Sequence, residues 1–260
     1  MLVNGVFADA VKANDRGLMY GDGVFRTLLV RKGVPQHWDR HYRRLSLDCE
    51  RIGISPPAME TLTEELLRLA KGDCVAKIVV TRGAGERGYL PDASVEPTRI
   101  ISKNPIPDHR ILNEVNARFC DLRLSHQPRL AGIKHLNRLE NVLARMEWRD
   151  PAIAEGLLLD INDHVIEGTM SSLFLYHEGC LIAPDLASCG VEGVQRERVI
   201  EYSMASNTPL QIRRFGQDEL LKAEEVFLVN SVIGLWQIVS IGERRWEKGG
   251  FCGELRKWLQ

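Results

Sequence analysis

The chain has 260 residues, of which 44% are hydrophobic and 27% charged, so it can form one large domain or two smaller ones with a sizeable core. Its formal net charge of −1 gives no overall field that favours nucleic acid or an anionic membrane, and an anionic ligand must therefore meet a local cluster of cations. The six cysteines are widely spaced without a CxxC pair, which argues against a zinc site and predicts no metal. No apolar stretch reaches the ~20 residues of a membrane span, and the N-terminal segment has no run of signal-peptide length. We therefore expect a cytoplasmic protein with reduced cysteines.

The first 35 residues predict a hairpin and then a strand. Asn4-Gly5 is a typical hairpin turn. Three glycines within residues 17–23 indicate a tight backbone course that leads into a strand over residues 24–30. Phe25, Thr27 and Leu29 share one face of this strand. A polar Thr27 on a core strand needs a hydrogen-bond partner or a functional role.

Two helices are expected next, over residues 37–53 and 59–71. The first carries apolar residues at helical spacing together with many bases. Arg44 is adjacent to Leu45, on the apolar side of this helix. A partly buried arginine favours an anionic partner such as a carboxylate or a phosphate, although an arginine on a solvated helix face is the simpler interpretation.

A glycine-rich loop follows the strand expected over residues 75–81. It spans residues 82–89 and contains two arginines, but it lacks the spacing and the final lysine of a phosphate-binding P-loop. Arg87 and Tyr89 on this loop are candidates for contacts with substrate carboxylates, and a plain surface loop is an equally good interpretation. After a strand over residues 99–102, Pro105 and Pro107 indicate a linker.

Lys134 stands at a junction in the middle of the chain. It follows Ala131-Gly132 and precedes a helix expected over residues 138–149. Placed beside apolar Ile133 and Leu136, its ammonium would be partly desolvated, and a desolvated amine is the nucleophile that attacks an aldehyde to form a Schiff base. A solvated lysine at a helix start is the alternative.

The C-terminal half alternates strands and helices. Glu167 lies at a turn between two strands, where a solvated acid is the ordinary interpretation. The glycine-rich segment 190–193 precedes a helix expected to begin at Arg196, and the free N–H groups of such a helix start favour a phosphate. Ser231 follows a strand over residues 224–230 and could cap a turn or donate to an anion.

Together these features resemble the fold-type IV pyridoxal-phosphate enzymes, the class of the branched-chain and D-amino-acid aminotransferases. The resemblance covers residues 4–237 and depends on three motifs, at residues 15–23, 82–89 and 130–140. The lysine segment 130–140 favours the carbon–oxygen lyases of this class over its aminotransferases. A binding protein that has kept the fold without activity is the remaining alternative.

The resemblance implies pyridoxal 5′-phosphate as the cofactor and a small-molecule substrate, without nucleic acid or membrane as partners. It assigns Lys134 to the Schiff base and Glu167 to the pyridinium nitrogen. Thr27 would lie over the substrate as a proton donor, and Arg87 and Tyr89 would contact the substrate. The implied phosphate ligands are Arg44, the backbone N–H groups of Val194 and Gln195, and the Ser231 hydroxyl.

The resemblance also implies an α/β (α+β) fold with two domains, in a homodimer. A smaller N-terminal α/β domain would cover residues 1–105. A linker would follow at 106–112, and a larger barrel-like domain carrying the lysine would cover residues 113–260.

Overall fold

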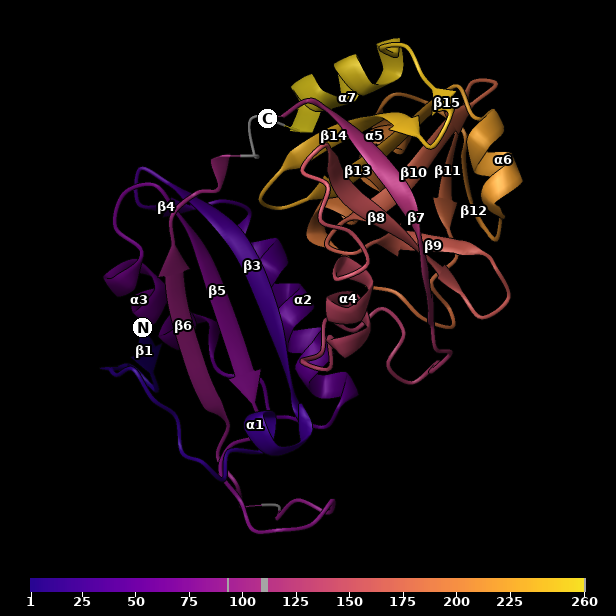
Figure 1. The fold of residues 1–260 in the computed structure, drawn as a ribbon. Coiled ribbons are helices and arrows are strands. Elements are labelled where there is room, and N and C mark those ends of the chain that lie inside the picture. Colours follow the sequence, from indigo (N-terminus) through magenta and orange to yellow (C-terminus); the bar gives the residue numbers. More distant parts are fainter. Residues whose placement is uncertain (93, 109–111, 260) are drawn as a thin grey trace. The chain divides into compact units, whose positions relative to one another are not determined.

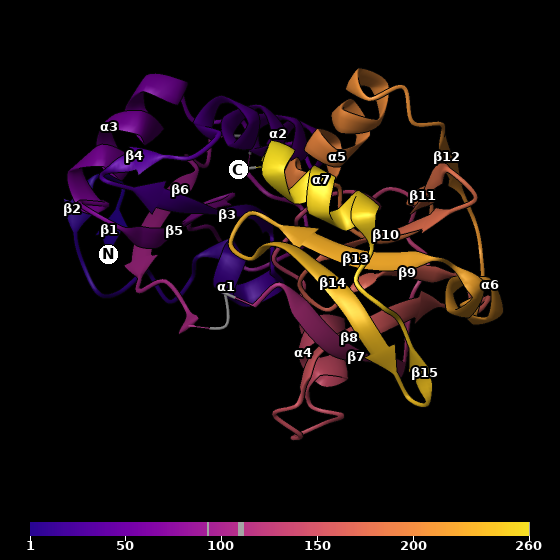
Figure 2. The ribbon, with the colours of Figure 1, turned by 90° about the horizontal axis from the view of Figure 1, so that it is seen from above.

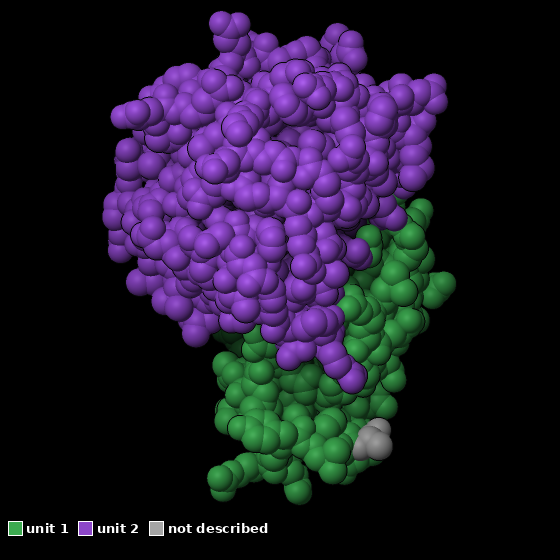
Figure 3. Space-filling model, turned by 90° about the vertical axis from the view of Figure 1, so that its right-hand side faces the viewer, with its two compact units in different colours: residues 1–107, 133–137 green, residues 108–132, 138–260 purple. Residues whose placement is uncertain are grey.

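The computed structural model describes residues 1–92, 94–108 and 112–259, and the chain divides into two compact units. Unit 1 contains residues 1–107 and 133–137, and unit 2 contains residues 108–132 and 138–260 (Figure 3). The domain boundaries drawn from the sequence stay a prediction, and residues 109–111 of the expected linker lie outside the described residues. One difference is clear. The lysine segment 133–137 groups with unit 1, although it was expected in the C-terminal domain.

Unit 1 is a six-stranded antiparallel sheet in the order β2-β1-β6-β5-β3-β4, with α2 and α3 on one of its faces (Figures 1 and 2). Asn4 and Gly5 have positive φ angles and form the expected hairpin turn between β1 and β2. The elements are β1 (Leu2–Val3), β2 (Val6–Phe7), α1 (Arg16–Tyr20), β3 (Gly23–Arg31), β4 (Val34–Pro35), α2 (Trp38–Arg51), α3 (Met59–Leu69), β5 (Cys74–Thr81) and β6 (Thr98–Asn104).

The two faces of β3 differ in burial as far as Thr27, after which Leu29 on the Phe25 face is buried as well. Arg26, Leu28 and Val30 are buried, whereas Phe25 and Thr27 are only partly buried. Because successive side chains of a strand point to opposite faces, Phe25 and Thr27 share the face away from Arg26. Arg26 contacts α2, so the helices cover the buried face and leave the Phe25 face for other contacts.

Unit 2 contains a nine-stranded mixed sheet, in which β10 pairs with both β9 and β13. These pairings close the ring β10-β13-β14-β7-β8-β9 into a barrel. The elements are β7 (Glu114–Leu124), α4 (Leu139–Arg145), β8 (Ile153–Asp160), β9 (Val165–Gly168), β10 (Ser172–His177), β11 (Cys180–Pro184), α5 (Val194–Ala205), β12 (Leu210–Arg213), α6 (Gln217–Lys222), β13 (Glu225–Asn230), β14 (Gly234–Ile241), β15 (Arg244–Arg245) and α7 (Gly250–Leu259).

Alternate residues of the barrel strands build two separate cores. Leu173 and Leu228 belong to the cluster that also contains Trp236, on one side of the sheet. The neighbouring residues Phe174 and Phe227 belong to a second cluster with side chains of α5 and α7, which pack over this part of the sheet (Figure 2). This alternation follows from the two-residue period of strands. The fold class predicted from the sequence, two α/β parts with a barrel-like C-terminal one, is confirmed.

The helix expected over residues 138–149 is shorter in the structure. It is α4, and it ends at Arg145. The Glu147 carboxylate accepts hydrogen bonds from the backbone N–H groups of Asp121 and Leu122, which holds the chain after the helix against β7. Among the helices of the described residues, none has the length and apolar character needed to cross a membrane.

Candidate functional site

Lys134 lies in an extended segment that pairs with the beginning of β3. The Phe25 N–H donates to the Lys134 carbonyl at 2.9 Å, and the Leu136 N–H donates to the Gly23 carbonyl at 2.9 Å. A Cβ added at Gly23 would meet both neighbours of the strand, at 2.6 Å from the Val80 carbonyl of β5 and 2.8 Å from Leu136 Cδ1, which explains the glycine. The lysine segment therefore behaves as an extra strand on the open edge of β3.

The Lys134 side chain lies on the Phe25 face of the sheet. Its ammonium is 4.9 Å from the centroid of the Phe25 ring, and the side chain is partly buried rather than extended into water. A second ammonium, from Lys77, is 4.7 Å from the same centroid. Thr27 pairs with Lys77 and shares this face, so unit 1 brings Lys134 and Thr27 to one surface. The predicted roles of both residues stay predictions.

Helix α2 supplies two polar groups near this segment, the carboxylate of Asp48 and the carbonyl of Arg44. Arg26 Nη2 donates to Asp48 Oδ2 at 2.5 Å and to the carbonyl of Arg44 at 3.3 Å. Asp48 Oδ2 also accepts from the Lys134 N–H at 3.0 Å. Arg44 thus lies one helical turn before the residue that holds Lys134.

The burial of this region changes the acidity of its groups. Burial raises the pKa of Asp48, against the opposing effects of the Arg26 guanidinium and the Lys134 N–H. Burial, and then the nearby Arg26 charge, lower the pKa of His41 to about 3. His41 is therefore neutral at ordinary pH, and the cations beside Lys134 are arginine and lysine side chains.

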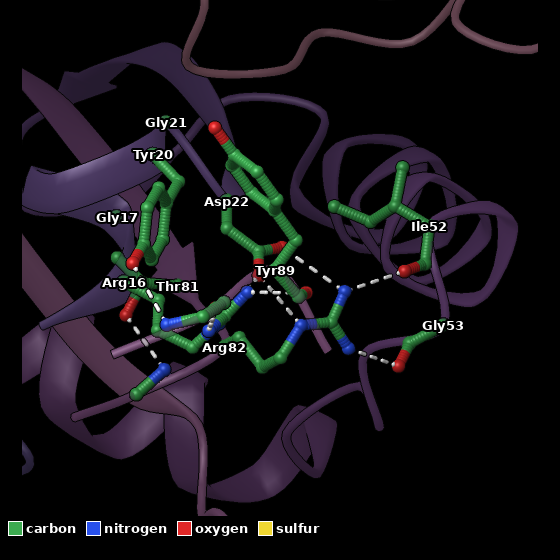
Figure 4. A network of polar contacts seen from close by, with 12 residues as sticks. Arg16, Gly17, Tyr20, Gly21, Asp22, Ile52, Gly53, Thr81, Arg82 and Tyr89 are labelled. Carbon is green, nitrogen blue, oxygen red and sulfur yellow. Dashed lines mark hydrogen bonds and ion pairs between the residues drawn. The ribbon is translucent and has the colours of Figure 1, made fainter. Parts of the chain in front are cut away.

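The glycine-rich loop after β5 begins at a hydrogen-bond network, in which two arginines donate to the Asp22 carboxylate and to backbone carbonyls (Figure 4). Arg82 makes two hydrogen bonds to the Asp22 carboxylate, at 2.7 and 3.0 Å, and Arg16 makes one at 3.0 Å. The Arg82 guanidinium also donates to the carbonyls of Ile52 and Gly53 at the end of α2. This network ties the motif at residues 15–23 to both the loop and the helix.

The same network holds the part of the loop that was predicted to contact substrate. Arg16 donates to the carbonyls of Gly88 and Tyr89, at 2.7 and 2.9 Å. The centroids of the Tyr20 and Tyr89 rings lie 5.7 Å apart. Tyr89 is nevertheless 89% exposed, and Arg87 is exposed as well. Their side chains are presented outward from an anchored backbone, and their contact with substrate stays a prediction.

In unit 2, Glu167 is buried at the end of β9. Its Oε2 accepts from the Val191 N–H at 2.9 Å, and its backbone pairs with Ser172 of β10. The turn after it is held by a second buried acid, Glu155. The five donors to the Glu155 carboxylate are the N–H groups of Gly156, Thr169 and Met170 and the hydroxyls of Thr169 and Ser171.

The other predicted residues of unit 2 gather near Glu167. Helix α5 begins at Val194, two residues before the expected start. Its N-cap residue is Gly193, which has no side chain to accept a hydrogen bond from the first N–H groups of the helix. A Cβ at Gly193 would lie 3.2 Å from Ser172 Oγ, and Ser172 pairs with both Glu167 and Val229. Ser231 follows two residues after Val229, in a turn where the Asn230 amide donates to the Met170 carbonyl at 3.0 Å.

Each unit therefore presents a chemically distinct set of groups. Unit 1 offers the amine of Lys134 with a hydroxyl and arginines, and unit 2 offers the Glu167 carboxylate with a helix N-terminus and a hydroxyl. These groups fit the aldehyde, the ring nitrogen and the phosphate of pyridoxal 5′-phosphate. The sequence interpretation missed Arg26, Asp48 and Glu155. Their only signal was a charged residue within an apolar strand or on the apolar side of a helix.

Comparison with known proteins defines the class. The family model described as amino-transferase class IV matches residues 23–241, and the chain belongs to this family. It is similar to the aminodeoxychorismate lyase of Vibrio harveyi, with 35% identity over 99% of this chain and 97% of that protein. It is also similar to the crystal structure of 4-amino-4-deoxychorismate lyase from Pseudomonas aeruginosa, with 45% identity, a TM-score of 0.94 and coverage of 99% and 97% of the two chains. A hypothetical aminotransferase from Mycobacterium tuberculosis in a PLP-bound form shares the fold, with 18% identity, a TM-score of 0.82 and coverage of 97% and 92%.

Proposed function

We propose that this protein is a pyridoxal-phosphate-dependent lyase that converts 4-amino-4-deoxychorismate into 4-aminobenzoate and pyruvate, as a step of folate biosynthesis. The observation that carries the proposal is the lysine segment. Its backbone is hydrogen-bonded on both sides of Lys134, and its amine is partly withdrawn from water over Phe25. Similarity over nearly the whole chain to two lyases of this name supports the choice of substrate.

The bound cofactor supplies an aldehyde that takes up amines and a cationic ring that accepts an electron pair. Lys134 would hold the cofactor through its amine, and once the substrate amine had taken its place, the same amine would remove the proton from the amine-bearing carbon. The bond between the ring carbon and the ether oxygen would then break, and the oxygen would leave with the bonding electrons as part of the enolpyruvyl group, which departs as an enolate. Lys134, with the Thr27 hydroxyl nearby, returns a proton to the departing enolate, which becomes pyruvate while the substrate ring becomes aromatic.

The remaining residues bind and orient. The Glu167 carboxylate keeps the proton on the cofactor's ring nitrogen, and its own position is held by the Val191 N–H. Arg44, the N–H groups of Val194 and Gln195 at the start of α5, and the Ser231 hydroxyl would hold the phosphate. Arg87 and Tyr89, exposed on the loop anchored by Arg16, contact the substrate.

We further propose that the protein acts as a homodimer in the cytoplasm. Support for the dimer comes from α4 and the residue that follows it, where Leu139, Val142, Leu143 and Met146 are all exposed. An exposed apolar face of this kind is typical of a surface that another chain covers. The six cysteines are unpaired thiols, in agreement with a reducing compartment. Sedimentation of the wild type and of Val142→Asp tests the dimer, because an added charge on this face should shift the protein towards the monomer.

The decisive experiment compares Lys134→Ala with Lys77→Ala. Both ammonium groups lie over the same Phe25 ring, so the pair separates the covalent role from general electrostatics. We expect Lys134→Ala to lose the visible absorbance of the bound cofactor, its borohydride-stable attachment and lyase turnover. Lys77→Ala should keep the absorbance and the attachment. Full turnover by Lys134→Ala would refute the proposal, as would a wild type that shows no absorbance after addition of pyridoxal phosphate.

An aminotransferase is the second candidate function, favoured by the description of the family itself. It would use the same lysine, glutamate and arginine. Release of pyruvate and 4-aminobenzoate from 4-amino-4-deoxychorismate without an amino acceptor identifies the lyase. Amino transfer to an added 2-oxo acid identifies the aminotransferase.

A further inference from the structure

Unit 1 contains a buried ion pair that the proposed chemistry does not use. Arg26 on β3 and Asp48 on α2 are 2% and 3% exposed, and the distance from Nη2 to Oδ2 is 2.5 Å. Taking two charges out of water is costly even when they meet, so replacing such a pair with apolar residues is often neutral or stabilising. A buried pair is therefore weak evidence for a role in stability alone.

The second partner of Asp48 is the backbone of the lysine. Asp48 Oδ2 accepts from the Lys134 N–H at 3.0 Å, while the Lys134 carbonyl accepts from the Phe25 N–H at 2.9 Å. The peptide groups on both sides of the Lys134 Cα are thus fixed to unit 1. The freedom that remains is rotation about the bonds of the lysine side chain, whose amine lies over Phe25.

We infer that Asp48, held in place by Arg26, is a positioning residue for Lys134. The inference rests on the proposed function, in which the same amine must hold the cofactor, leave it and then transfer protons. Such an amine has to reach several atoms while the Lys134 Cα stays in one place. A displacement of about 1 Å at a reacting group can lower a rate about a hundredfold. The guanidinium of Arg26 donates to the same Oδ2 and orients the carboxylate, so that it can accept the Lys134 N–H.

The alternative is that the pair only joins α2 to β3. Two double variants separate these roles, because both remove the buried charges and differ only at the acceptor. Arg26→Met with Asp48→Asn keeps a side-chain oxygen for the Lys134 N–H. In the second double variant, Arg26→Met with Asp48→Leu, the side chain at position 48 has a similar size but no hydrogen-bond acceptor. If the leucine variant does not fold, Asp48→Ala in the same background removes the acceptor with less bulk.

The first readout is hydrogen exchange of the Lys134 N–H in the protein without cofactor, resolved to this residue by NMR. We expect exchange about tenfold faster in the leucine variant than in the asparagine variant, as the loss of one buried hydrogen bond implies. In the loaded enzyme, kcat should fall about tenfold between the same two variants while KM changes little, because the amine and not the substrate site is displaced. Equal exchange and equal kcat in the two variants would overturn the inference.

The chain offers a matched control on its surface. Asp73 accepts from the Arg31 guanidinium and from the backbone N–H of Lys32, each at 2.7 Å, but this group of residues is exposed. Asp73→Asn should change neither the exchange of the Lys134 N–H nor kcat. If the wild type failed to form a borohydride-stable bond with pyridoxal phosphate, the proposed function would fail. The exchange comparison would still decide whether Asp48 holds the lysine.

Discussion

Each unit contains a buried acid that holds the backbone at or next to a residue of the candidate site. The surroundings of the two buried carboxylates differ. In unit 1, Asp48 holds the backbone of Lys134 and is neutralised by the guanidinium of Arg26. In unit 2, Glu155 accepts five hydrogen bonds, four of them from the turn after Glu167, and the described residues contain no ion pair to it. A buried carboxylate can thus be stabilised by one cation or by a set of oriented dipoles. Substitution of the two carboxylates should therefore lower the free energy of unfolding by different amounts.

The largest loss in the free energy of unfolding is expected for Asp48→Leu as a single substitution. It leaves the buried Arg26 guanidinium without this carboxylate, and breaking a buried pair from one side typically costs about 3–5 kcal/mol in the free energy of unfolding. Urea unfolding should show a much smaller loss when Arg26→Met is added to Asp48→Leu. Equal losses in the single and the double variant would show that the charge of Arg26 is not the cause.

Glu155→Gln should have the next largest effect. A glutamine offers one oxygen and one NH₂ group to donors that all point at a carboxylate, so some N–H groups of the turn after Glu167 lose their acceptor. We expect a loss of about 1–3 kcal/mol in the free energy of unfolding. The surface acid Glu224 also accepts a backbone N–H, and Glu224→Gln is the matched control, with an expected change within about 0.5 kcal/mol. A Glu155→Gln protein as stable as this control would contradict the dipole model.

The buried histidine of unit 1 predicts a pH dependence. The pKa of His41 falls from 6.5 to about 3 on folding, so between these values the unfolded chain binds the proton and the folded chain does not. Stability is therefore complete above pH 6.5 and falls as the pH drops, by about 2 kcal/mol at pH 5 from this group. Urea unfolding of His41→Leu at pH 5 and pH 7 should show a smaller difference than the wild type. An unchanged difference would assign the acid sensitivity to other groups.

The smallest effect is expected at the exposed Arg31–Asp73 pair. Its geometry resembles that of Arg26–Asp48, but water screens both of its charges. Asp73→Asn should change thermal unfolding less than any of the substitutions above. A loss comparable to that of Asp48→Leu would mean that burial is not what distinguishes the two pairs.

Much of the fold could be predicted from local patterns. Periodicity placed β3, α2 and the start of α3, and the glycine-rich segment before α5 predicted a helix start within two residues. The grouping of Glu167, the start of α5 and Ser231 was available only through the resemblance, because it depends on strand register in the barrel. Within α4 the apolar pattern continued past Arg145, and the contacts of Glu147 with β7 ended the helix.

The contacts of the two buried acids, Asp48 and Glu155, could not be predicted from local patterns. Asp48 meets Arg26 across 22 positions and Lys134 across 86, and no local pattern encodes such separations. Glu155 reaches Thr169 across 14 positions, through a pairing of strands that only the closed barrel defines. In each case the residue type indicated that a partner was needed, and the tertiary structure alone identified it.

The addition of residues 133–137 to the edge of β3 has a consequence for synthesis of the chain. When the ribosome has completed residue 107, the sheet of unit 1 still lacks the segment that pairs with Gly23 and Phe25, and Asp48 lacks one of its two donors. The N-terminal part therefore cannot finish folding before residues 133–137 have left the exit tunnel. A nascent chain arrested between these points should be more sensitive to protease than one arrested well beyond residue 137, because its strand edge is still open.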